Sequence, residues 1–270
     1  NKSITLDLNG KTLTNTNSGK ATISVQGGTV TVKNGNVVGG TGYYNIEVTK
    51  SSNANLTLTD VTATAGNNGS SMIDNWGTMT ITSGTYTGGL NVVKSEEGSK
   101  LTIAGGTFTL DYAPSSGYTA AILVYGDTTI TGGEFIQSDK SAPYGQAQVI
   151  HTDKSNAATK TTITGGVFKN LCTRSTAWTI RTVGSDSSFT KVSGGTFNKS
   201  ISDGYCADGF IPTKNADGTY GVKEGKYVVK VGSTGYETFD GAIDAANKSS
   251  NSKTIKLLED LTVDHRIVIK

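Results

Sequence analysis

The chain has 270 residues with a formal net charge of +2, and 17% of its residues are charged. This near-neutral charge argues against nucleic acid as a partner, and no apolar run is long enough to predict insertion into a membrane. The two cysteines are too few for a disulfide scaffold or a zinc site, and we expect no metal and no cofactor.

The first predicted element is a strand in residues 3–8, where apolar and polar residues alternate. No leader segment precedes this strand, so we expect the chain to be a fragment of a longer protein. A repeat of eight copies then extends to residue 197. Its clearest copies, residues 101–109, 129–135, 162–168 and 192–197, read Ile-Thr-Gly-Gly-Thr-Phe or close to it.

Each copy has an aliphatic anchor and, usually five residues later, a bulky apolar residue. Adjacent anchors are separated by 22 residues (81 to 103) to 33 residues (130 to 163). The anchors are Leu8, Val32, Leu58, Ile81, Ile103, Ile130, Ile163 and Val192. The constant offset predicts that the residues five positions on form one internal stack, made of Tyr86, Phe108, Phe135, Phe168 and Phe197.

A second short strand precedes each later anchor and also has one apolar face. These strands are centred on Ile23/Val25, Ile46/Val48, Ile73, Val92, Ile122/Val124, Val149 and Ile180. Short strands in units of this length, without helical patterning before residue 236, predict an all-β fold. We expect a right-handed parallel β-helix, a solenoid of about eight coils, over residues 1–198.

The longest insertions between strands are residues 111–118, 138–144 and 171–178, and they carry aromatic side chains. Aromatic rings with polar neighbours suit sugar binding, and loops often hold binding sites. The candidate ligand-binding residues are Tyr112, Tyr118, Tyr144 and Trp178. The alternative interpretation is that these rings only shield the corners of the coil.

Threonines flank the anchors and are expected to point outward. Those before the anchors are Thr31, Thr57, Thr80, Thr102, Thr129 and Thr162, and those after are Thr59, Thr82, Thr131 and Thr164. A flat Thr-x-Thr grid suits ice binding. Thr also suits exposed strands and stacks with Thr above and below, so the grid has a structural explanation as well.

After residue 198 the period breaks. Residues 199–225 are predicted to form a C-terminal cap with a hairpin turning at Asp217–Gly218. We expect residues 226–270 to form a small α+β segment, the start of a following module. We expect strands at 227–231, 254–258 and 267–269 and a helix with one apolar face, comprising Phe239, Ala242, Ile243 and Ala246, capped by Thr238.

Residues 236–246 followed by residues 254–260 resemble the N-terminal helical cap and first strand of pectate-lyase-like parallel β-helices. The resemblance is greatest to those in large surface proteins of Gram-positive gut bacteria, whose repeats and closing strands are similar to residues 129–135 and 217–222. It implies an extracellular or cell-surface location in bacteria. In that family a cap and strand commonly precede a segment like residues 4–10, which implies tandem modules and head-to-tail self-association through 226–270.

Families with this fold include polysaccharide lyases and hydrolases, but their Asp-Asp and Gly-His-Gly segments are absent. The acids considered, which form no convergent set, are Asp127, Glu134, Asp139 and Asp153. His151 beside Asp153 is either an acid-base cluster or part of a polar outer face. Cys172 and Cys206 follow adjacent repeats, so they are either bridged or buried thiols.

We therefore expect no catalytic residues and a non-catalytic structural or adhesive segment of a bacterial surface protein. Its expected partner is a glycan or a host-surface ligand bound through the loop aromatics. The alternatives are a carbohydrate-active β-helix enzyme, either a polysaccharide lyase or a hydrolase, and an ice-binding protein.

Overall fold

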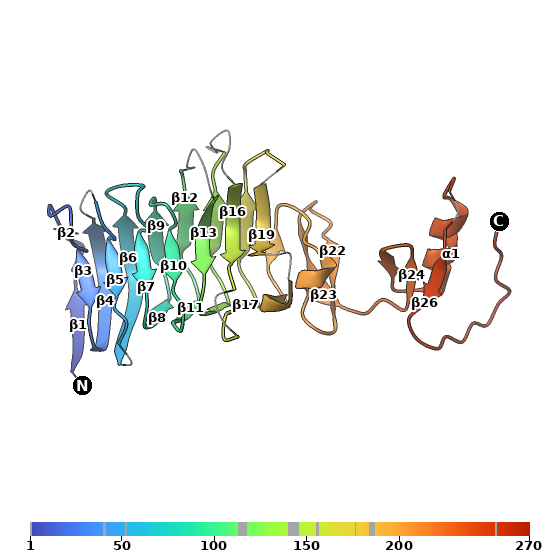
Figure 1. Cartoon of the computed structure of the whole chain (residues 1–270), viewed down its shortest axis with the longest axis horizontal. Coiled ribbons are helices and arrows are strands. Elements are labelled where there is room, and N and C mark those ends of the chain that lie inside the picture. Colours follow the sequence, from blue (N-terminus) through green and yellow to red (C-terminus); the bar gives the residue numbers. More distant parts are fainter. Residues whose placement is uncertain are drawn as a thin grey trace.

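The computed structural model describes residues 2–39, 42–51, 53–112, 118–139, 146–154, 157–175, 177–183, 187–251 and 253–270. They form an elongated parallel β-solenoid of about seven turns, followed by a capping hairpin and a small body with one helix and one sheet (Figure 1). The expected all-β parallel solenoid is confirmed. In the part of the chain described, no helix has the length and apolarity to cross a membrane.

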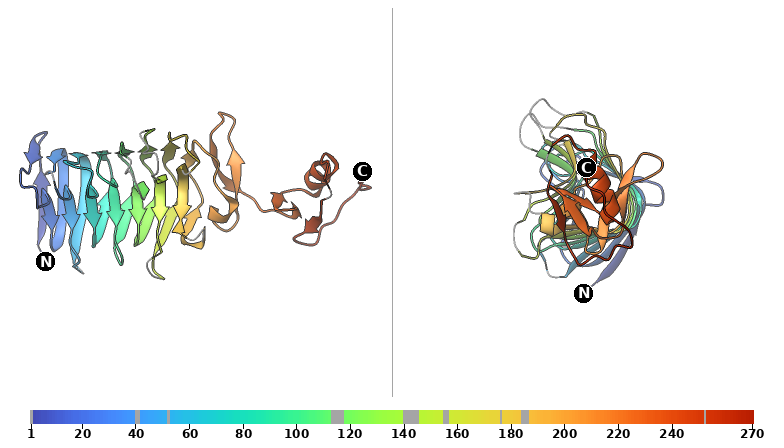
Figure 2. Two further views of the ribbon diagram at one scale, coloured as in Figure 1. Left: turned by 45° about the horizontal axis from the view of Figure 1, so that its top comes forward. Right: turned by 90° about the vertical axis from the view of Figure 1, so that its right-hand side faces the viewer.

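Three strand faces surround the core, as the view along the solenoid axis in Figure 2 illustrates. Face 1 contains β1 (Ser3–Asp7), the first halves of β4 (Gly28–Val38) and β6 (Ala54–Thr64), β8 (Thr78–Ile81), β11 (Lys100–Ile103), β14 (Asp127–Ile130), β17 (Lys160–Ile163) and β20 (Thr190–Val192). Face 2 contains β2 (Thr12–Thr14), the second halves of β4 and β6, β9 (Gly84–Thr87), β12 (Thr107–Leu110), β15 (Glu134–Gln137), β18 (Val167–Asn170) and β21 (Thr196–Phe197).

Face 3 is a separate sheet of seven strands. Its members are β3 (Ile23–Val25), β5 (Ile46–Val48), β7 (Ile73–Asn75), β10 (Val93–Ser95), β13 (Tyr118–Val124), β16 (Gln146–Thr152) and β19 (Ala177–Thr182). On all three faces each strand pairs in parallel with the equivalent strand of the next turn, so residues one repeat apart lie side by side.

The anchors form one continuous register on face 1. Seven of them, Val32, Leu58, Ile81, Ile103, Ile130, Ile163 and Val192, are consecutive partners as predicted. The first anchor was assigned wrongly, because Leu6 and not Leu8 pairs with Val32. The chain turns at Asn9 and Gly10, both with positive φ. Because of this turn, the apolar residue Leu13 follows the anchor Leu6 by seven residues, whereas the distance in the other copies is five.

The predicted aromatic stack is confirmed. Its five rings are fully buried, and consecutive centroids lie 4.9, 5.0, 4.9 and 4.8 Å apart with nearly parallel planes. A glycine pair turns the chain sharply between faces 1 and 2 just before each of the later rings. The second glycine has positive φ, as at Gly133 (102°), and a Cβ on Gly132 would lie 2.3 Å from the carbonyl oxygen of Ala104.

The outward threonines of face 1 are in register from turn to turn, as expected. Thr57, Thr80, Thr102, Thr129 and Thr162 are consecutive partners. They are half-buried by their neighbours. The Oγ1 atoms of Thr59 and Thr82 are hydrogen-bonded at 2.8 Å, so this surface is also held together by contacts along the column.

A polar column inside the last turns was not predicted. Thr128, Thr161 and Thr190 continue the buried column that Met79 and Leu101 occupy in earlier turns. At the corner between faces 3 and 1, Thr152 Oγ1 lies 2.7 Å from Thr161 Oγ1 and 2.9 Å from Thr190 Oγ1. Hydrogen bonds between these hydroxyls replace apolar contacts there.

The cap begins where the repeat ends. β22 (Phe210–Lys214) and β23 (Tyr220–Glu224) form the hairpin expected at Asp217–Gly218, and β23 adds antiparallel to β21 through Tyr220 and Phe197. The hairpin thereby covers the last turn of face 2 and the end of the aromatic stack.

The C-terminal body has a core of its own around Val229 and Ala242. Helix α1 (Phe239–Asn247) is capped as predicted, with Thr238 Oγ1 accepting a hydrogen bond from the Gly241 N–H. The antiparallel sheet joins β24 (Val229–Val231), β25 (Thr234–Tyr236) and β26 (Ile255–Leu257).

Two expectations for this body were wrong. Strand β25 was missed, because the turn at Gly232, with φ of 62°, returns the chain immediately along β24. Residues 267–269 are not a strand, because the end of the chain is instead bound by the side chain of Asn247. Its Nδ2 donates to the Val268 carbonyl at 3.0 Å, and its Oδ1 accepts from the Lys270 N–H at 2.8 Å.

Candidate functional site

Face 3 carries a column of outward-pointing residues whose chemistry changes along the solenoid. The column runs through Ser24, Glu47, Asp74, Lys94, Leu123, His151 and Arg181. Its acids, Glu47 and Asp74, lie in early turns and are followed by Lys94, and its last member is the cation Arg181. Between the two cations lie Leu123 and His151, whose buried ring is neutral.

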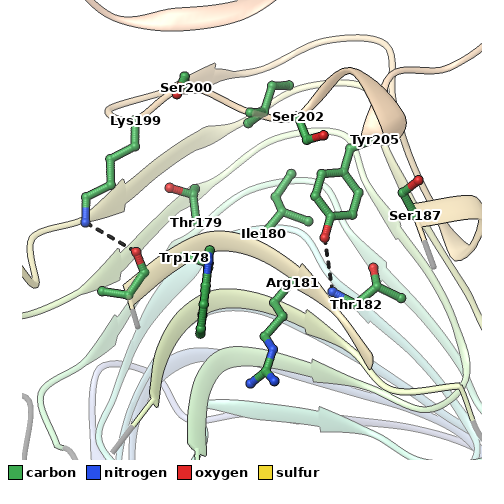
Figure 3. Close-up of a pocket in the computed structure, with 12 residues that line it drawn as sticks. Trp178, Thr179, Ile180, Arg181, Thr182, Ser187, Lys199, Ser200, Ser202 and Tyr205 are labelled. Carbon is green, nitrogen blue, oxygen red and sulfur yellow. Dashed lines mark hydrogen bonds between the residues drawn. The ribbon is translucent and has the colours of Figure 1, made fainter. Parts of the chain in front are cut away.

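A groove of about 610 Å³ lies at the last strand of this face (Figure 3). It is bounded by β19 on one side and by residues 199–205 on the other. Its lining residues are Ala177, Trp178, Thr179, Ile180, Arg181, Thr182, Ser187, Lys199, Ser200, Ile201, Ser202 and Tyr205. Hydroxyl groups and two cationic side chains therefore dominate its polar chemistry.

Trp178 and Arg181 form a pair on the outer rim of the groove. The guanidinium carbon of Arg181 lies 4.9 Å from the centre of the Trp178 ring, a cation–π contact. In Figure 3 both side chains point away from Thr179 and Ile180, which face the segment 199–205. Trp178 remains 38% exposed, so this large ring is available at the surface.

Among the four predicted ligand-binding aromatics, Trp178 is the one that lines this groove. Tyr112 is half-buried just after β12, at the corner between faces 2 and 3. Tyr118 begins β13 at that corner, with its backbone paired to Gln146. Tyr144 lies outside the described residues. Tyr112, Tyr118 and Trp178 all lie where the chain passes from face 2 to face 3, so these three belong to one corner of the solenoid.

A buried acidic pair in the middle of face 3 was missed. Asp74 and Glu96 are 1% and 6% exposed, and Lys94 forms an ion pair with Glu96. The indole N–H of Trp76 donates to Asp74 Oδ2 at 2.8 Å. Burial, together with the charge of Glu96 and a hydrogen bond to it, raises the pKa of Asp74 to about 7.

This pair is not placed to cleave a glycoside. Two acids that do so flank the scissile bond about 5–10 Å apart and must reach the substrate, whereas Asp74 and Glu96 are buried and Asp74 already accepts a hydrogen bond from the Trp76 indole. Of the acids considered and set aside in the sequence, Asp127 pairs with Lys160 at 3.3 Å and Glu134 with Lys169 at 2.5 Å. These acids are engaged in ion pairs on different faces.

His151 does not belong to an exposed polar face, because its side chain is completely buried. Burial and the nearby Arg181 lower its pKa to about 4, which keeps the ring neutral at physiological pH. The adjacent Asp153 acts in the opposite direction. A buried, neutral histidine here has a packing role in the wall of face 3.

The two cysteines are buried and unbridged. Cys172 packs with Ala147 and Ala177 beside the groove. The backbone of Cys206 pairs with that of Val192 in an isolated parallel β-bridge at the cap. Burial raises the pKa of the Cys206 thiol to about 11, so its reactive thiolate form is scarce at neutral pH.

Within the described ranges, no group of three or more His, Cys, Asp or Glu side chains is arranged to hold a metal ion. Comparison with known proteins found no matching family model, no matching curated protein and no matching solved structure.

Proposed function

We propose that this chain is a non-catalytic solenoid segment of an extracellular or surface-displayed bacterial protein and that it binds a glycan of the host or environment around Trp178. One observation carries the proposal: an exposed tryptophan stands at the rim of a groove whose described lining has hydroxyls but no carboxylate. A sugar ring can stack on the indole while its hydroxyls bond to the polar lining. Acid-base cleavage at this groove has no described acid to perform it.

The chain has two tryptophans, which permits a direct test. In the Trp76→Phe variant, Trp178 becomes the sole indole reporter. Glycans that bind at the groove should change its fluorescence and saturate. Trp178→Ala should abolish binding measured by calorimetry, whereas Trp76→Ala, which removes the ring under Lys50 on an earlier turn, should leave it intact. Equal binding by both alanine variants would contradict the proposal.

The enzyme alternative has its own assay. Incubation with polyuronates and neutral polysaccharides should release no product above a buffer control. Product that disappears in Asp74→Asn would overturn the non-catalytic assignment.

Ice binding is the second candidate, and the in-register threonines of face 1 favour it. If it is correct, the protein inhibits ice recrystallisation, and Thr102→Lys with Thr129→Lys removes the effect. Thr62→Lys on face 2 serves as the control, since Thr62 is exposed but outside the grid. No inhibition by the unmodified chain excludes this candidate.

Head-to-tail self-association through residues 226–270 is the proposed mode of assembly. In support, the first turn exposes Ile4 (53%) and Leu6 (38%), although their partners Val30 and Val32 lie in the core wall. The C-terminal body in turn exposes Ile269 (71%). Contact between such apolar ends is heterologous and can propagate. Sedimentation should detect oligomers that disappear when residues 226–270 are deleted, and an unchanged mass would contradict this assembly.

A further inference from the structure

Face 3 ends at β19, and no described strand pairs with the outer edge of that strand. Every earlier strand of the face is paired on the side of the next turn. The chain does continue above β19 as residues 199–205, but it passes at a distance and leaves the groove between them (Figure 3). The groove therefore occupies the position of a missing eighth strand.

Side chains take the place of that strand at both ends of the groove. Lys199 Nζ donates to the carbonyl oxygens of Cys172 (2.6 Å) and Ala177 (3.5 Å). The hydroxyl oxygen of Tyr205 accepts from the Thr182 N–H at 3.2 Å. Because backbone groups alternate along a strand, the N–H and C=O of Ile180 face the same edge as the Thr182 N–H.

A second observation points to a ligand in the middle of this edge. The Thr179 hydroxyl is buried, with the residue 4% exposed, and it has no hydrogen-bond partner among the described residues. Figure 3 shows this side chain directed toward the segment that carries Ser200. A buried hydroxyl without a partner costs free energy that a bound polar group recovers.

The charge of the groove selects the partner. Arg181 and Lys199 are the charged members of its described lining, and neither forms an ion pair with a described carboxylate. In contrast, the lysines Lys33, Lys94, Lys160 and Lys169 on the solenoid walls are each paired with an acid. An acidic ligand would supply the missing counter-charge.

We propose that the groove binds an extended peptide segment with acidic side chains, provided by a partner protein, which adds to face 3 as an eighth strand. The edge of β19 left free between Ala177 and Thr182 has four residues, so the part of the segment that pairs with it is about 13 Å long. Main-chain hydrogen bonds to the edge hold the peptide, and its acidic side chains meet Arg181 and Lys199. The site goes beyond the glycan proposal, because it uses the strand edge and not the Trp178 ring.

Four synthetic hexapeptides test the mode of binding by calorimetry. The first reads Thr-Glu-Val-Glu-Val-Thr with blocked ends, and the second replaces each Glu by Lys. The third and fourth are the first peptide with alternate backbone nitrogens methylated, one in each of the two possible registers. We expect the acidic peptide to bind, the basic peptide to bind at least roughly tenfold more weakly, and one of the two methylation registers to abolish binding. Equal binding of both methylated registers and the unmethylated peptide excludes strand addition, and no binding by the acidic peptide overturns the proposal.

Protein variants test the residues. Arg181→Gln should weaken the acidic peptide roughly tenfold, whereas Lys191→Gln, an equal loss of charge on face 1, should not. Tyr205→Phe frees the Thr182 N–H and should strengthen binding. Unchanged affinity in both Arg181→Gln and Tyr205→Phe, with native thermal unfolding, contradicts the site. A concentration-dependent dimer lost in Arg181→Gln would make a second copy, not an acidic partner, the occupant.

The glycan proposal and the peptide proposal can each be contradicted without the other. Trp178→Ala removes the stacking surface but not the strand edge, so it should abolish glycan binding and leave peptide binding within about threefold. Loss of both ligands in Trp178→Ala would show one shared site and overturn the assignment of the peptide to the edge.

Discussion

The rings of Phe108 and Phe135 are stacked face to face, with centroids 5.0 Å apart and planes only 7° from parallel. The two residues are strand partners in consecutive turns. Their ring separation matches the 4.7–4.9 Å spacing between adjacent strands, so the backbone ladder itself sets the aromatic contact. Each of the three inner rings, Phe108, Phe135 and Phe168, thus contributes to two turn-to-turn stacking contacts.

Phe135→Ala should lower the free energy of unfolding by roughly 3–5 kcal/mol, because it leaves a cavity between two stacked rings. Chemical denaturation followed by circular dichroism measures the change. Val167→Ala is the control: Val167 is the outward neighbour of Phe168 and is 36% exposed. A loss below about 1 kcal/mol in Phe135→Ala would show that the stack relaxes around the gap.

Gly132→Ala should destabilise the solenoid by more than 1 kcal/mol, since its Cβ would meet the Ala104 carbonyl oxygen at 2.3 Å. The displaced atom is backbone in the adjacent turn, so a rotamer change cannot relieve the clash. Gly19→Ala is the matched control, because its added Cβ meets only Asn17 Oδ1, at 3.8 Å. Equal thermal unfolding temperatures for the two variants would contradict the close approach of turns at the glycine corner.

Asp74 should make stability depend on pH. Its folded-state pKa is raised to about 7 from 3.8, so the bound proton stabilises the fold fully below pH 3.8, and this contribution is lost as pH rises through 7. The loss is at most about 1.4 kcal/mol per pH unit. Asp74→Asn, which mimics the protonated acid, should remove it.

The measurement is the unfolding free energy of both proteins between pH 5 and pH 8. The wild-type chain should lose stability relative to Asp74→Asn as pH rises. His151, whose pKa is lowered, has the opposite effect on stability: through it the protein becomes less stable as pH falls from 6.5 to about 4. It is present in both proteins, so the difference isolates Asp74. A difference that does not vary with pH argues against a shared proton.

Cys172 and Cys206 should be unreactive toward a thiol reagent in the native protein and both reactive after unfolding without reductant. Burial of both residues, and the raised pKa of Cys206, give the physical reason. Intact mass before and after denaturation counts the modified thiols. Detection of no free thiols after unfolding would mean that the pair is bridged.

The repeat and its core could be predicted because solenoid geometry converts a fixed sequence offset into a spatial stack. Phe108, Phe135 and Phe168 follow their anchors by five residues, and nothing intervenes but a glycine corner. The first turn broke this rule because the Asn9–Gly10 turn adds residues, which made Leu8 look like the anchor in place of Leu6.

The acidic pair and the groove could not be predicted in the same way. Asp74 and Glu96 come together only when face 3 is aligned so that Asp74 pairs with Lys94, and the variable loops hide that register. Trp178 was singled out as a loop aromatic, but the groove beside it depends on how far residues 199–205 stand from β19. That distance is a property of the cap and has no repeat to reveal it.

The aromatic stack covers only part of the solenoid, and this has a mechanical consequence. In the first three turns the same column contains Leu13, Val37 and Ala63, whereas the later turns contain aromatic rings. Stability in such arrays is a sum over neighbouring turns, so the N-terminal turns form the weaker end. When the two termini are pulled apart, the N-terminal turns should unfold first, one after another. The force needed should then rise when the turns with stacked rings are reached. The solenoid should therefore resist extension more strongly as unfolding proceeds from its N-terminal end to its C-terminal end.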